Sequence, residues 1–191
     1  IQAAAELFVT GIWGTSTTLT GTNQWSDFAN SDPIADSDLA IRTILRNTGA
    51  RPNTLFVGLV GWEKLKEHPL VLDKYKHTQI GIMTPALVAA ALGIDEIVIG
   101  DSVRNTGAEG ATFVGADIWT DNALYLVRNN PALGVANGAY TYIWNERGNF
   151  PWAVETYREE DRRAEVTRVF THRDFVVTSS QHGYMLLDLA A

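Results

Sequence analysis

The sequence predicts an α+β fold, with a compact lobe of a mixed sheet and flanking helices and a second lobe carrying a long β-hairpin. Two observations predict this fold. Between residues 36 and 127, helical patterns alternate with short apolar runs, which is typical of a sheet with helices on its faces. After Phe150, the pattern changes to two long strands joined by a polar turn.

A helix, a sharp stop, a strand and a second helix are expected between residues 36 and 69. Asp36 or Ser37 is expected to cap the first helix, because either side chain can accept from the unpaired N–H groups of its first turn. The buried face of this helix is predicted from the three- and four-residue spacing of Ile41, Ile44, Leu45 and Thr48.

Four residues are interpreted as fold punctuation. Gly49 lies where a helix ends in the left-handed conformation, so we expect a positive φ there. Pro52 prevents the helix from continuing, and Asn53 opens the apolar run 55–57, which is expected to be a central strand. Gly93 is expected to stop a later helix that Thr84 caps.

The second helix is expected to bury Trp62 and Leu65 and to close at Pro69, before a short helical turn at 70–76. Upstream, residues 2–9 are interpreted as the end of a helix. A loop or edge segment follows at 11–23, and Trp25 and Phe28 are expected to anchor it.

The remaining strands follow from short apolar or alternating runs. Core strands are predicted at 95–100 and 123–127, with a glycine-containing loop at 102–112 between them. The long hairpin pairs 152–157 with 165–170, and two final strands follow at 175–177 and 184–189. The last of these is expected to rejoin the first sheet.

Composition limits the possible functions. The 191 residues can bury a core, and the formal net charge of −7 argues against a nucleic-acid-binding surface. The absence of cysteine excludes disulfides and thiolate chemistry. No apolar run reaches the length of a membrane span. The chain does not begin with methionine, so we expect a fragment or a processed form.

The order of these motifs resembles the major capsid proteins of tailed bacteriophages, with the Hong Kong 97-like capsid fold. The resemblance rests on the helix followed by Thr48-Gly49, the run from Pro52 to Leu55, Trp62 with Leu65, and His68-Pro69. It is supported by Trp25 before the Asp-Pro-Ile at 32–34, Leu92-Gly93-Ile94 before a strand, and the strand pair after Phe150.

The resemblance implies a domain organisation. Residues 1–31 would be the end of the spine helix and a linker, and residues 32–145 the axial domain. Residues 146–174 would be the long hairpin of the peripheral domain, and 175–191 the strands that return to the axial sheet.

The resemblance also implies a structural role. The chain would self-assemble, through hexamers and pentamers, into an icosahedral phage or prophage shell that encloses DNA. It would be a virion component assembled in the bacterial host cytoplasm, with other virion proteins as partners. No sequence-specific nucleic-acid binding and no membrane partner are expected.

The hairpin is the most informative polar segment, because nine of the fourteen residues from 155 to 168 are charged, with both signs. A solvated hairpin would use such charges to block edge pairing. A subunit interface would use them to fix register and partner choice. With the resemblance in view, we interpret seven residues as a subunit interface: Glu155, Arg158, Glu159, Arg162, Arg163, Glu165 and Arg168.

The motifs that could indicate an enzyme are incomplete. His172-Arg173-Asp174 lacks the other kinase motifs, and the two glycines at 58 and 61 lack the rest of a phosphate loop. The acidic pairs Asp36/Asp38 and 159–161 are explained by capping and by neighbouring arginines, although calcium held by several loops stays open. We therefore predict no catalytic residue, no metal ligand and no cofactor.

Two alternatives stay open. An encapsulin-type compartment shell shares the capsid fold and would need a groove for cargo peptides. A small α/β enzyme or ligand-binding domain would need convergent polar groups in an apolar pocket. Particle size distinguishes a shell protein from a monomeric enzyme.

Overall fold

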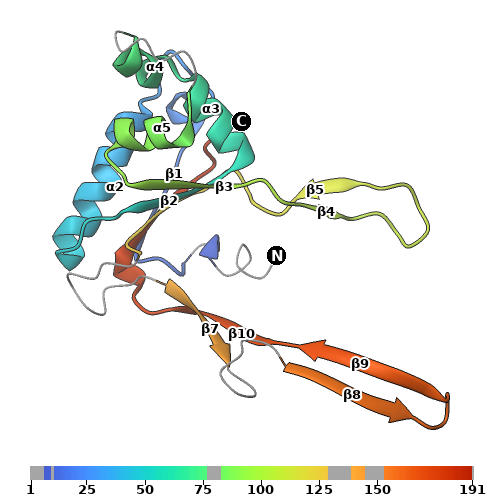
Figure 1. The fold of residues 1–191 in the computed structure, drawn as a ribbon. Coiled ribbons are helices and arrows are strands. Elements are labelled where there is room, and N and C mark those ends of the chain that lie inside the picture. The colour runs from blue at the N-terminus through green and yellow to red at the C-terminus, as the bar shows by residue number, and fades with distance from the viewer. Residues whose placement is uncertain (1–6, 10, 77–82, 129–138, 145–152, 191) are drawn as a thin grey trace. The chain divides into compact units, whose positions relative to one another are not determined.

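The fold is that of a computed structural model, which describes residues 7–9, 11–76, 83–128, 139–144 and 153–190. The chain forms two compact units. The first comprises Ile1–Gly138 with Val177–Ala191, and the second comprises Ala139–Val176 (Figure 1). The predicted helix at 2–9 lies largely outside the described residues.

The first unit contains a five-stranded mixed sheet with the strand order β1-β11-β6-β2-β3. Two of its neighbouring pairs, β1 with β11 and β2 with β3, are parallel, and β6 is antiparallel to both β11 and β2. Its strands are β1 (Thr15–Thr18), β2 (Thr54–Gly58), β3 (Glu96–Gly100), β6 (Ala123–Leu126) and β11 (Gly183–Leu187). The predicted α+β class with a mixed sheet is therefore confirmed. The last predicted strand joins this sheet, but the strand predicted at 175–177 does not, because it belongs to a separate pair of strands.

The helices of this unit lie close to their predicted positions. They are α2 (Pro33–Thr48), α3 (Leu59–Glu67), α4 (Pro69–Tyr75) and α5 (Pro85–Leu92), with 3-10 turns η1 (Gly21–Asn23) and η3 (Ser180–His182). The predicted segment at 11–23 contains the edge strand β1. The predicted loop at 102–112 is wrong in part, because β4 (Val103–Asn105) lies within it and pairs with β5 (Gly115–Asp117).

The described residues of the second unit form two strand pairs. β8 (Ala153–Glu159) and β9 (Ala164–Phe170) form the predicted hairpin, and β7 (Ala139–Trp144) pairs with β10 (His172–Val177). The residues His172-Arg173-Asp174, which match part of a kinase motif, therefore lie at the start of strand β10.

An apolar core holds the first unit together. Its most deeply buried members come from the sheet, from α2 and α3, and from the segments before α2 and after β11: Trp25, Ile44, Leu55, Leu65, Tyr125 and Leu189. Trp25 and Leu65 are buried as predicted. Phe28 is not a buried anchor, since 39% of its surface is exposed; its ring makes a T-shaped contact with the ring of His68.

The predicted cap of α2 is wrong by one turn. Asp32 is the capping residue, and its Oδ1 accepts from the N–H groups of Ile34 and Ala35 at 3.0 Å each. Pro33 then fills the first helical position, where no N–H is needed. The two residues expected as caps have other partners. Ser37 Oγ lies 2.6 Å from the Tyr125 hydroxyl, and Asp36 accepts from the indole N–H of Trp25.

The buried face of α2 is also shifted from its predicted position. Ile41 and Ile44 are buried, but Leu45 is 45% exposed. The face instead includes Ser37 and Ala40, because the helix begins earlier than predicted and packs its small residues against the sheet.

Gly49 ends α2 with a φ of 72°, as predicted. A β-carbon there would meet nothing within 4 Å, so any cost of substitution comes from the backbone. We expect Gly49→Val to lower the free energy of unfolding by about 1–2 kcal/mol, because a β-branched residue is strained at this φ. Gly49→Asn is the matched control and should lose less, since asparagine tolerates this conformation. Urea denaturation measures both, and equal losses would contradict the account.

Asn53 joins three strands at one end of the sheet. Its backbone oxygen accepts from Asp95 and Glu96, and its Oδ1 accepts from the N–H of Arg128 at 2.8 Å. Its Nδ2 donates to the Arg128 carbonyl. Gly93 also behaves as predicted, ending α5 with a φ of 73°.

Pro69 begins α4 rather than only closing α3, and the buried His68 caps this new helix. His68 Nδ1 accepts from the N–H of Leu70 at 3.3 Å, and its Nε2 lies 3.0 Å from Ser31 Oγ. Ser31 Oγ donates to the Asp27 carbonyl, so it accepts from an Nε2–H. These contacts fit a neutral imidazole.

Burial lowers the pKa of His68 below its ordinary 6.5, with Asp32 opposing the shift. The unfolded chain therefore binds more protons as pH falls below about 6.5, and this contribution to stability is lost towards the lower folded pKa. We expect the free energy of unfolding to fall between about pH 7.5 and about pH 5.5. His68→Asn keeps a capping oxygen without the titration, so this part of the pH dependence should disappear in denaturation curves. An unchanged pH dependence in His68→Asn would show that other groups cause it.

Candidate subunit interface

All seven predicted interface residues lie in the strands or in the turn of the β8–β9 hairpin. Its register places Glu155 opposite Arg168, Arg158 opposite Glu165, and Glu159 opposite Ala164. Residues directly opposite in an antiparallel pair share a face. One face therefore carries Arg158 with Glu165, and the other carries Glu155 and Glu159 with Arg168.

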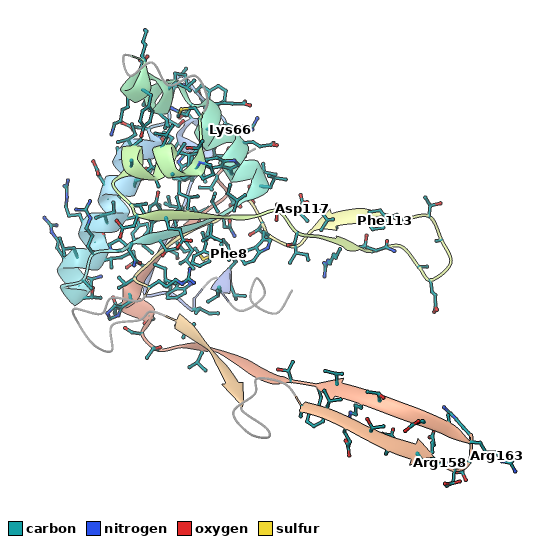
Figure 2. The ribbon with its side chains drawn as sticks, in the orientation of Figure 1. Phe8, Lys66, Phe113, Asp117, Arg158 and Arg163 are labelled. Carbon is teal, nitrogen blue, oxygen red and sulfur yellow. The ribbon has the colours of Figure 1, made fainter. Side chains whose placement is uncertain are left out.

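The ion pairs of this hairpin are near its tip and are open to solvent. Arg158 Nε lies 3.1 Å from Glu160 Oε1, and Arg162 Nε lies 3.9 Å from Glu159 Oε2. Arg158 thus pairs with a neighbour in the turn rather than with the opposite Glu165. Exposed pairs of this kind contribute little to the stability of a chain. Figure 2 labels Arg158 and Arg163 at this end of the hairpin.

Sequence reasoning did not identify the apolar residues on this hairpin. Val154 and Val169 lie opposite each other and are 62% and 65% exposed, and Thr156 lies opposite Thr167 on the same face. Tyr157, on the other face, is 45% exposed. The available signal in the sequence was that each valine is next to a charged residue. Because successive side chains of a strand point to opposite faces, the register then places both valines on one face.

The turn of the hairpin contains a strained residue. Arg163 has a φ of 49°, and its N–H donates to the Glu160 carbonyl at 3.2 Å. A positive φ is uncommon for a residue other than glycine, asparagine or aspartate. Glycine would adopt this turn conformation more easily, but arginine places a positive charge at the tip of the hairpin.

The candidate enzyme sites do not gain support from the structure. A β-carbon at Gly58 would lie 1.9 Å from the Thr120 carbonyl oxygen, so protein backbone fills the strand-to-helix junction where a phosphate would bind. Asp36 is engaged by Trp25. Within the described ranges, no group of three or more His, Asp or Glu side chains is placed to hold a metal ion.

The chain is similar to two phage proteins. It is 30% identical over 147 residues to the major capsid protein of Burkholderia phage BcepMu, covering 73% of this chain and 45% of that protein. It is 27% identical over 139 residues to the major capsid protein of Pseudomonas phage JBD67, covering 70% and 43%. The chain thus spans less than half the length of either protein. No protein-family model matches it.

A solved structure has the same fold. A phage-related protein from Bordetella bronchiseptica RB50 superimposes with a TM-score of 0.80 at 22% sequence identity, covering 98% of this chain and 61% of that one. The two curated relatives confirm the resemblance to phage capsid proteins that the order of motifs predicted, and the solved structure shows that the fold is shared.

Proposed function

We propose that this chain is part of a major capsid protein, which assembles with copies of itself into the icosahedral head shell of a phage or prophage. The single observation that carries the proposal is the similarity of 73% of the chain to a protein named as a major capsid protein. The shared fold of the solved phage-related protein supports it. In this proposal the role is structural, and the chain has no catalytic site.

The proposed shell would be built from hexamers and pentamers, in the virion, and assembled in the cytoplasm of the host bacterium with other virion proteins. Sequence-specific binding of DNA is not part of the proposal, because the net charge of −7 repels phosphate. Among the described residues, no helix has the length and apolar character needed to cross a membrane.

Within this assembly, we assign the β8–β9 hairpin to a contact with a neighbouring subunit. A two-stranded hairpin is marginally stable by itself in water, and this one exposes Val154 and Val169. A neighbouring subunit that covers the valines would add apolar burial. The charged residues around them would then select the partner and the register.

Reversing the charges of the hairpin tests this contact. We expect the variant Arg158→Glu, Arg162→Glu, Arg163→Glu to fold normally, because these side chains are exposed, but to assemble poorly. The defect should increase at low salt, where like charges repel without screening. Circular dichroism reports the fold, and sedimentation of the full-length protein reports assembly.

The matched control replaces the same three arginines by lysine, which keeps the charge and should assemble at near-normal yield. Each exposed pair contributes only about 0.2–1 kcal/mol, so the loss depends on repetition of the contact around the shell. Normal particles from the glutamate variant at low salt would show that the hairpin is only a solvated surface.

A further inference from the structure

The pair of strands β4 and β5 presents an apolar and acidic face. Val103 lies opposite Asp117 in the register, so the two share a face. The Phe113 ring belongs to the same face, since a β-carbon at Gly115 would lie 3.1 Å from it. Val103 and Phe113 are 55% and 63% exposed. Figure 2 labels Phe113 and Asp117 on this ribbon.

The charge of this segment is predominantly negative. Between residues 101 and 121 there are four acidic residues and one arginine, which gives a net charge of −3. Within the described part of the chain, neither Asp101 nor Asp117 forms a salt bridge. The β4–β5 hairpin therefore offers an apolar surface beside carboxylates that have no described cationic partner.

Helix α2 presents the complementary chemistry. Leu39, Arg42 and Arg46 follow one another at three- and four-residue spacing, so they form one exposed stripe. Leu39 is 52% exposed. Residues 39–62 contain three arginines and no acidic residue, and Asp38 lies one turn before Arg42. This stripe therefore offers an apolar surface beside guanidinium groups.

The two surfaces cannot meet within one subunit. α2 ends at Thr48, just before β2 begins at Thr54. The β4–β5 hairpin follows β3, which ends at Gly100 and runs parallel to β2. The hairpin therefore lies beyond the C-terminal ends of both strands. The C-terminal part of α2 and the hairpin thus lie at opposite ends of these strands.

We propose that the β4–β5 hairpin of one copy docks on the exposed stripe of α2 in a second copy of the chain. The partner is a second copy because the two surfaces have opposite charge, each has exposed apolar side chains, and one chain carries both. A contact between two different surfaces of identical subunits is heterologous, and repeating it by rotation closes a ring. This inference rests on the proposed shell function and gives its rings a second contact, separate from the β8–β9 hairpin.

A charge-exchange experiment tests the pairing in the full-length protein. The hairpin variant carries Asp101→Lys and Asp117→Lys, and the helix variant carries Arg42→Glu and Arg46→Glu. Each should raise the protein concentration needed for half-maximal assembly by about fivefold or more. The variant that combines all four substitutions should recover at least half of that loss. Phe113→Ser should weaken assembly without changing the circular dichroism spectrum.

The control for net charge carries Glu67→Lys and Asp95→Lys, two exposed positions outside both surfaces, and should assemble more readily than the hairpin variant. If the wild type assembles but the combined variant is no better than the weaker of its two parents, the docking is wrong and the proposed function stands. A wild type that never assembles contradicts both.

Discussion

Gly58→Ala is expected to unfold the protein or to destabilise it by at least about 3 kcal/mol. A β-carbon at this position would lie 1.9 Å from the Thr120 carbonyl oxygen and 2.9 Å from its carbonyl carbon. These are backbone atoms, which cannot rotate away as a side chain can. The N–H of Gly58 also donates to the Asn122 carbonyl at 3.2 Å, so separating the two segments would break that hydrogen bond.

Gly14→Ala provides the matched control. Its β-carbon would lie 2.4 Å from Nε2 of Gln181, which is the end of an exposed, flexible side chain. Rotation of Gln181 relieves this clash, so we expect a loss below about 1 kcal/mol. Thermal and urea denaturation compare the two variants. Similar losses at Gly58 and Gly14 would show that residues 120–122 move aside easily.

Trp25→Ala is expected to lower the free energy of unfolding by about 3–5 kcal/mol. The side chain is fully buried, and its indole N–H donates to Asp36 Oδ2 at 3.0 Å. Its backbone N–H donates to the Leu189 carbonyl at 2.7 Å, which ties the segment before α2 to the C-terminal strand region. Truncation would remove a large apolar volume and leave a partly buried carboxylate without its donor.

Trp25→Phe separates these two effects. It keeps most of the apolar volume but removes the hydrogen bond, which opposes the burial that raises the pKa of Asp36 above its ordinary 3.8. The pKa of Asp36 should therefore rise further. A raised folded pKa contributes stability at low pH that is lost as pH rises through that pKa. The deficit of Trp25→Phe relative to the native protein should thus be smaller in acid than at neutral pH. A deficit that does not change with pH would show that the hydrogen bond from Trp25 does not affect the pKa of Asp36.

The features that could be predicted from the sequence depend on local chemistry. Gly49 and Gly93 end helices because a left-handed residue is needed there and glycine provides it at little cost. The long strands of the hairpin could be predicted because both contain β-branched and aromatic residues and a polar turn separates them. The three-residue strands β4 and β5 are too short to show such a pattern, so the sequence indicates a loop at 102–112.

The features that could not be predicted depend on distant contacts. Asp36 and Ser37 have the right chemistry for a cap, but Trp25 and Tyr125 engage them from elsewhere in the chain. The Asp32-Pro33 pair was the overlooked local signal, since proline favours the first helical position. The exposed valines of the β8–β9 hairpin became an interface candidate only when the register placed them on one face.

Electron microscopy of the purified full-length protein, combined with sedimentation, tests the central claim most directly. We predict closed shells, or rings of five and six subunits, that form from the protein alone or with its virion partners. The Arg158, Arg162 and Arg163 to glutamate variant should remain folded and fail to form them. A protein that stays monomeric at high concentration under all salt conditions, with its native fold intact, would contradict the proposed shell function.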